Sequence, residues 1–271
     1  MSTTRRPVVF NPDLLLKLAC VLLVMALLTA IATWVDDRLV SQQIVQANVW
    51  AKPLKFQLSM AVQLTTVWWA LRHMQLQGPL MSGQALLVGL LVVTVIFEAS
   101  YITLQGARGV PSHFNRTSDW ERLAGSMMAA GAYVLVGTSA WIGTIAGWRW
   151  LRQSPSSREP MLLAIALGFV LMFVLAGWTG STLGQYRGPF VQAVPLSGVT
   201  LPLTLWRLDV GDLRISHFMG NHVMQALPLL AWLLMKHPQS LQHLAITAAA
   251  AAWTAFTIGM LYRALSNTGF L

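Results

Sequence analysis

The sequence is poor in charged residues and contains a single cysteine. Only 10% of its 271 residues are Asp, Glu, Lys or Arg, whereas 55% are hydrophobic. A soluble globular domain has about 25% charged residues, so this composition excludes that class and indicates a membrane protein. The lone Cys20 lies in an apolar segment, which excludes an intramolecular disulfide and a pair of cysteine metal ligands.

Seven apolar segments are long enough to cross a bilayer as helices. A transmembrane helix needs about 20 apolar residues because the hydrocarbon core is about 30 Å thick. We therefore predict an all-α fold, a polytopic membrane helical bundle that forms a single transmembrane domain over residues 1–271. Its expected spans are roughly 12–34, 53–74, 84–105, 120–148, 160–183, 215–236 and 243–265. The start of the chain is also typical of a cleavable signal, but the six later spans favour an uncleaved first helix.

The basic residues are scattered among the connections and the ends of the spans, and the formal net charge is +9. This scatter favours membrane lipids as partners and argues against nucleic acid. Lys and Arg divide almost evenly between the two sides, so the positive-inside rule orients the chain only weakly, and Arg5 and Arg6 favour a cytoplasmic N-terminus. Tryptophans at the span ends, among them Trp148 and Trp150, are typical of an interfacial aromatic belt.

Three of the expected spans carry polar residues at helical spacing. Polar side chains are costly in lipid and usually face the interior of a bundle. At about 100° per residue, four residues of the second span and four of the third each fall on one face, and the sixth span has a broader polar arc. The sets are Lys55, Ser59, Gln63 and Thr66; Thr94, Glu98, Tyr101 and Gln105; and His217, Asn221, His222 and Gln225.

These stripes converge on the side opposite the N-terminus, which we expect to be periplasmic or extracellular and call the outer side. Glu98 and His222 each lie seven residues from the outer end of their spans, which places both about 10 Å below that boundary. The flanking connections add further polar groups, and the site expected from the sequence has two sets. The catalytic candidates are Glu98, Arg108, His113, Asp212 and Arg214, and the substrate-binding candidates are Lys55, Gln63, Tyr101, Gln105, Asn115, Asn221 and Gln225.

Four of the candidate residues could bind a transition metal or a haem. Three imidazoles and a carboxylate suit zinc, iron or copper, and these residues are Glu98, His113, His217 and His222. No metal-binding motif such as H-E-x-x-H supports the set. Other interpretations stay open, because a buried carboxyl group can carry a proton and histidines can hydrogen-bond between helices. Asp212 and Arg214 could instead cap and pair at the start of the sixth span.

Three segments resemble those of an uncharacterised family of bacterial integral membrane proteins. They read NVWAKPLKF, FEASYITLQGARGVPSHFN and GDLRISHFMGNHVMQALPL. The resemblance implies the inner membrane of a bacterium as the location and brings no activity with it. A looser similarity links Lys55, the triplet from Pro111 to His113, and Arg214 to the type-2 phosphatidate phosphatases. The glycine of that family's P-S-G-H element is absent here, and the spacing from arginine to histidine differs.

From these observations we expect a membrane-embedded enzyme or redox protein that binds a metal or haem. It would act on a lipid-like or anionic small molecule near the outer face, and the 184–214 connection could cover the site as a lid. A proton-coupled transporter is the main alternative, and a hydrolase similar to the lipid phosphatases is a further one. The sequence does not indicate an oligomeric state.

Overall fold

A computed structural model describes residues 11–39, 43–44, 47–75, 82–113, 115–193, 198–201 and 204–269 of the protein. Arg5 and Arg6, on which the expected orientation depends, lie outside these ranges. The described part contains seven α-helices: α1 (Asp13–Leu39), α2 (Ala51–His73), α3 (Ser82–Ala107), α4 (Asp119–Arg152), α5 (Pro160–Tyr186), α6 (Leu213–Leu233) and α7 (Gln239–Leu265). A 3-10 turn at Pro155–Ser157 and an antiparallel pair of two-residue strands, β1 (Gln43–Ile44) and β2 (Ala47–Asn48), complete it. The prediction of an all-α fold is confirmed.

Five of the described helices are long and apolar enough to cross a membrane. They are α1, α3, α4, α5 and α7, and this property supports assignment to the membrane proteins. The two helices that do not meet the criterion, α2 and α6, correspond to the expected second and sixth spans. Both were predicted to carry polar stripes, which lower the mean hydropathy of the helix.

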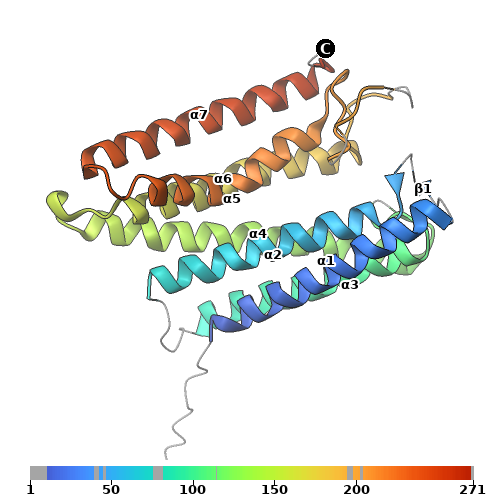
Figure 1. The fold of residues 1–271 in the computed structure, drawn as a ribbon, viewed down its shortest axis with the longest axis horizontal. Coiled ribbons are helices and arrows are strands. Elements are labelled where there is room, and N and C mark those ends of the chain that lie inside the picture. Colours follow the sequence, from blue (N-terminus) through green and yellow to red (C-terminus); the bar gives the residue numbers. More distant parts are fainter. Residues whose placement is uncertain are drawn as a thin grey trace, which may run out of the picture. The chain divides into compact units, whose positions relative to one another are not determined.

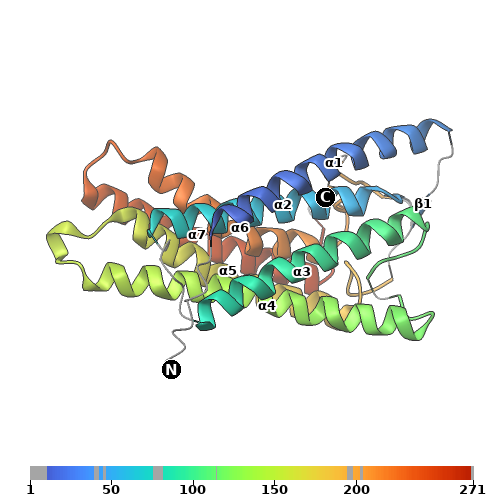
Figure 2. The same ribbon diagram turned by 90° about the horizontal axis from the view of Figure 1, so that it is seen from below.

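The chain divides into two compact units, and the boundary between Thr138 and Ser139 falls inside α4. In the first unit α1 lies against α2 and α2 lies against α3, as Figure 2 shows for the first pair. In the second unit α5, α6 and α7 contact one another and run side by side (Figure 1). We describe the polar residues of each unit separately.

Small residues allow α5 and α6 to approach closely in the second unit. A Cβ atom at Gly220 would lie 2.9 Å from the backbone nitrogen of Ala176, and one at Gly168 would lie 3.1 Å from Cα of Met224. Glycine at these two positions therefore brings the helix backbones together, as is common between helices in membranes. The resulting contact holds the polar start of α6 against α5.

Candidate functional site

Glu98 lies in the apolar helix α3 and is buried, with 4% of its surface exposed. Its Oε1 atom has no hydrogen-bond partner, and no ion pair to its carboxyl group is found in the described part of the chain. Gly131 of α4 lies directly against it, because a Cβ atom there would be 2.6 Å from Oε1 and 2.7 Å from Cγ2 of Thr94. Oε1 therefore packs beside the backbone of α4, with neither a donor nor a counter-charge among the described residues.

A chain of hydrogen bonds begins one turn beyond Glu98 on the same face of α3. Gln105 donates from Nε2 to the hydroxyl of Tyr101 at 3.0 Å, and Arg108 donates from Nη1 to Oε1 of Gln105 at 2.8 Å. The same Nη1 lies 3.3 Å from Oε1 of Glu121 at the start of α4. Tyr101 and Gln105 are buried. The polar stripe predicted for α3 is thus a buried face, and its arginine pairs with Glu121.

A basic and aromatic cluster lies where α2 begins and the α3 to α4 loop passes. The ring of His113 lies 5.2 Å from the ring of Phe56, and the Nζ atom of Lys52 lies 6.0 Å from that ring. Nδ1 of His113 is 3.2 Å from the hydroxyl of Ser112. Burial and the positive charge of Lys52 lower the pKa of His113 to about 3. His113 is therefore a neutral imidazole at physiological pH.

The polar stripe predicted for α2 is not the buried face of that helix. Lys55 and Ser59 are exposed, and Gln63 is half-buried. The buried face carries apolar residues and one polar residue that the sequence analysis missed, Gln57, which is fully buried and donates from Nε2 to the hydroxyl of Thr103 at 2.9 Å. Substrate binding by Lys55 and Gln63 stays a prediction.

Asn115 shapes the loop before α4. Its Oδ1 atom accepts from the backbone nitrogen of Thr117 at 3.1 Å and from the Thr117 hydroxyl at 2.9 Å. Contacts of an Asn side chain with the residue two places ahead are typical of turns. These two local hydrogen bonds stabilise the turn. Substrate binding by Asn115 stays a prediction.

In the second unit His217 joins α6 to α5. Its Nδ1 lies 3.1 Å from the hydroxyl of Thr179, and its Nε2 lies 3.1 Å from Nδ2 of Asn221. The Thr179 hydroxyl donates to the carbonyl of Leu175 at 2.7 Å, so the Thr179 oxygen accepts the Nδ1 proton of a neutral His217. One ring nitrogen thus bonds to another helix, and the other bonds to a residue of the same helix. This arrangement matches the interpretation of His217 as a hydrogen-bonding residue.

The ring of His222 packs in an aromatic cluster with Phe218 of α6 and Trp206 of the preceding loop. This ring lies 4.1 Å from that of Phe218, whose other neighbour is Trp206 at 5.1 Å. Gln225, one turn further along, is half-buried. His222 thus has an aromatic neighbour in Phe218 and a hydrogen bond to the side chain of Gln225.

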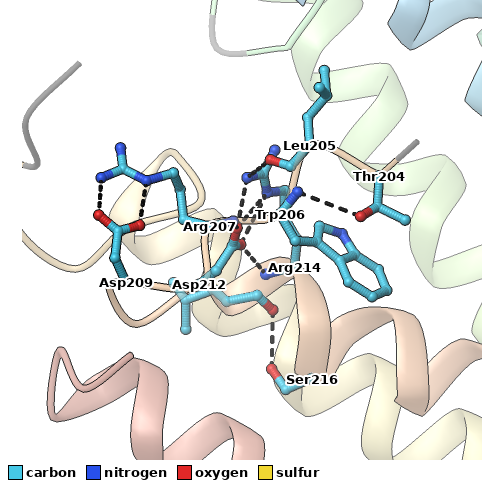
Figure 3. Close-up of polar contacts among 9 residues, drawn as sticks. Thr204, Leu205, Trp206, Arg207, Asp209, Asp212, Arg214 and Ser216 are labelled. Carbon is cyan, nitrogen blue, oxygen red and sulfur yellow. Dashed lines mark hydrogen bonds and ion pairs between the residues drawn. The ribbon is translucent and has the colours of Figure 1, made fainter. Parts of the chain in front are cut away.

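Asp212 accepts several hydrogen bonds at the start of α6 (Figure 3). It caps α6 by accepting from the backbone nitrogen of Arg214 at 3.0 Å, and it accepts from the backbone nitrogen of Arg207 at 2.9 Å. The guanidinium of Arg214 binds both carboxylate oxygens and also donates to the carbonyl of Leu205 at 2.7 Å. The capping and pairing alternative for Asp212 and Arg214 is confirmed.

The loop before α6 is ordered by the same group of charges. The side chain of Arg207 is 7% exposed and donates from Nε and Nη2 to the two carboxylate oxygens of Asp209, which lowers the pKa of Asp209. Leu201 and Leu208 donate backbone hydrogen bonds to Trp206 and Val199, forming a short hairpin. The sequence analysis did not select Arg207. Residues 194–197 and 202–203 of the expected lid lie outside the described ranges, so the lid stays a prediction.

The candidate residues therefore fall into two sets, one in each unit, and a single pocket built from both stays a prediction. No group of three or more His, Cys, Asp or Glu side chains suited to a metal ion occurs among the described residues. The expected set of Glu98, His113, His217 and His222 receives no support as a metal site.

The fold defines a class, that of all-α proteins with several helices able to span a membrane. Neither a known protein family, nor a curated protein, nor a solved structure matches this chain. A functional conclusion must therefore come from the residues themselves.

Proposed function

We propose that this chain is a polytopic protein of the bacterial inner membrane, in which Glu98 binds and releases a proton during the coupled transport of a small solute. In this proposal α2 and α6 join the five apolar helices as further membrane spans. The observation that carries the proposal is the buried Glu98 carboxyl group, for which the described part of the chain offers neither a hydrogen-bond donor at Oε1 nor a counter-charge.

An ionised carboxylate in such surroundings is costly, and protonation removes the charge. Arg108 cannot compensate it in the described arrangement, because its guanidinium binds Gln105 and Glu121. A bound metal ion would need more ligands than Glu98 alone, and no such group is present among the described residues. A reversible proton is therefore the ligand that best fits an isolated buried carboxyl group.

The two halves of α3 differ in polarity, which supports access for the proton from one side. From Glu98 toward the end of the helix, Tyr101 and Gln105 form a polar face that continues to Arg108. In the other direction, the buried residues of the helix are Val88, Leu91 and Val95. We expect Glu98 to exchange its proton with water at the end that carries Gln105.

A hydrophobic carbodiimide tests the protonation of Glu98, because it reacts with protonated carboxyl groups in apolar surroundings to give a stable acylurea. We expect peptide mass spectrometry to find the adduct on Glu98 in membranes, with less adduct as pH rises. Glu98→Gln should remove it. Asp119→Asn is the matched control, since the Asp119 side chain is 96% exposed and should contribute no adduct. Unmodified Glu98 in the folded protein would refute its role as the proton carrier.

A second experiment tests the coupling itself. Proteoliposomes that contain a pH-sensitive dye are given a solute gradient from a panel of small metabolites, and internal pH is followed. We expect at least one solute to drive proton movement in the wild-type protein and in Asp119→Asn, and none to do so in Glu98→Gln. Equal proton movement with and without the Glu98 carboxyl group would contradict the proposal.

A further inference from the structure

Two side chains of the second unit, those of Arg158 and His243, contact Trp150 at the end of α4. The guanidinium of Arg158, just before α5, stacks on the indole ring with Cζ 4.4 Å from its centroid. The ring of His243, in the second turn of α7, meets the indole edge-on, with 6.0 Å between centroids. None of these residues belongs to the polar sets described above.

Three buried nitrogens of this cluster have no hydrogen-bond partner among the described residues. Nε1 of Trp150, Nε of Arg158 and Nε2 of His243 are each buried without a hydrogen bond in the part of the chain that the structure describes. A buried donor without a partner costs about 1–3 kcal/mol, and such groups are rare in proteins. The indole and guanidinium nitrogens can only donate, and the imidazole nitrogen donates in one tautomer or when protonated. The missing partner is therefore a hydrogen-bond acceptor.

The surrounding charges favour an acceptor that is negative. The segments 149–159 and 234–243 carry four basic residues, Arg149, Arg152, Arg158 and Lys236, against one acid, Glu159. Two helices, α5 and α7, begin here while α4 and α6 end here, so their dipoles offset one another and the basic side chains decide the sign of the local charge. Arginine donors in a fixed planar fork match the oxygens of a phosphate group.

A second stack on the same helix shows that stacking alone does not create this arrangement. Arg152 lies over Trp148 with Cζ 4.6 Å from the ring centroid, nearly the same distance as in the first stack. Both residues of the second stack are exposed, and Trp148 has 56% of its surface accessible. Arg152 thus extends along an exposed ring. Arg158 instead has a buried Nε that finds no partner among the described side chains and backbone groups.

We propose that Trp150, Arg158 and His243 bind a phosphate group, carried either by the headgroup of an anionic phospholipid or by free inorganic phosphate. The site is independent of Glu98 and goes beyond the proposed transport function. Its position beside the helix ends, with tryptophan and arginine together, is typical of the headgroup level of a bilayer.

Calorimetric titration of the detergent-purified, delipidated full chain tests this site. The probes are a short-chain phosphatidylglycerol, inorganic phosphate, and a short-chain diacylglycerol that lacks phosphate. We expect phosphatidylglycerol to bind more tightly than diacylglycerol, and Arg158→Gln to weaken this binding by about tenfold or more, since one charge-assisted hydrogen bond is lost. Arg152→Gln should change the affinity by less than about twofold, as expected for an exposed charge. Binding of inorganic phosphate with the same dependence on Arg158 would assign the site to the free anion.

A further variant separates a ligand site from a structural cluster. Trp150→Phe keeps a ring under Arg158 and removes the buried N–H group. If phosphate fills the site, this variant binds phosphatidylglycerol or phosphate more weakly than the wild-type protein. If the cluster is only structural, removal of an unpaired donor leaves binding unchanged and leaves thermal stability equal or higher. Unchanged affinity in Arg158→Gln, or equal losses in Arg158→Gln and Arg152→Gln, would overturn the proposal.

Discussion

Asp212 and Glu98 are both buried acids near polar faces of helices, but their surroundings differ completely. Asp212 is held by two backbone nitrogens and by the guanidinium of Arg214, whereas Oε1 of Glu98 meets no donor. A carboxylate at the start of a helix finds donors in the chain itself, while one in the middle of a helix faces backbone groups that are already bonded. The first acid therefore stabilises the start of α6, and the second is the group to which we assign the proton in the proposed function.

The largest expected effect comes from Asp212→Ala. Removal of this buried carboxylate takes the counter-charge from Arg214, which keeps its bond to the Leu205 carbonyl, and takes the acceptor from the backbone nitrogen of Arg207; loss of one partner of a buried ion pair costs roughly 3–5 kcal/mol. Denaturation in mixed micelles measures the free energy of unfolding. Asp119→Ala is the control: its side chain is 96% exposed and that of its partner Arg122 is 53% exposed, so we expect a loss below about 1 kcal/mol. Equal losses would remove the distinction between the buried and the exposed acid.

The next effect tests the packing around Glu98. In Gly131→Ala the new methyl group would meet Oε1 of Glu98 and Cγ2 of Thr94, and overpacking of this kind costs about 1–3 kcal/mol. Gly125→Ala on the same helix meets nothing within 4 Å, so it should be neutral or stabilising by up to about 1 kcal/mol. The same denaturation measurement applies to both. A Gly131→Ala variant as stable as Gly125→Ala would show that α3 and α4 are not in close contact here.

A smaller effect is expected from His113 in acid. Its pKa is about 3 in the folded protein, because of burial and Lys52, and about 6.5 in an unfolded chain. Between these values only the unfolded chain binds the proton, so the free energy of unfolding falls as pH falls below about 6.5, and the residue has no effect above that pH. The side chain keeps some exposure, so the slope should stay below the one-proton limit of about 1.4 kcal/mol per pH unit. Stability curves of the wild-type protein and His113→Gln should diverge only on the acid side, and parallel curves would contradict this assignment.

The smallest effect on stability is expected for Glu98→Gln. The substitution keeps the shape of the side chain and removes no hydrogen bond or ion pair among the described residues, so stability near pH 7 should change by less than about 1 kcal/mol. Carbodiimide reactivity should nevertheless disappear. A loss as large as that of Asp212→Ala would mean that Glu98 has a structural partner.

The sequence predicted the helices well because their apolar runs are long and locally encoded. The expected fifth span, 160–183, agrees with α5 at Pro160–Tyr186, and the buried face of α3 was predicted from spacing alone. The buried face of α2 was not predicted correctly, because we assumed that its polar stripe is buried. The residues that pack inward are apolar, apart from Gln57.

Contacts between residues that are far apart in the chain could not be predicted from the sequence. His217 meets Thr179, which is 38 residues away on another helix, and nothing in the spacing of either residue indicates their contact. The ion pairs of Arg207 depend on how the loop folds back before α6. The Trp150 cluster was interpreted as part of an aromatic belt, because residue type at a span end does not show which nitrogens are buried.

The length of α4 has a consequence for the membrane around the protein. Its 34 residues, at about 1.5 Å each, extend about 51 Å, which is longer than a complete bilayer of about 40–45 Å. In a bilayer such a helix must tilt or project beyond the headgroups, and the balance between the two depends on the thickness of the lipid. Acyl chain length is therefore a physical variable to which this protein is expected to respond, independently of any ligand.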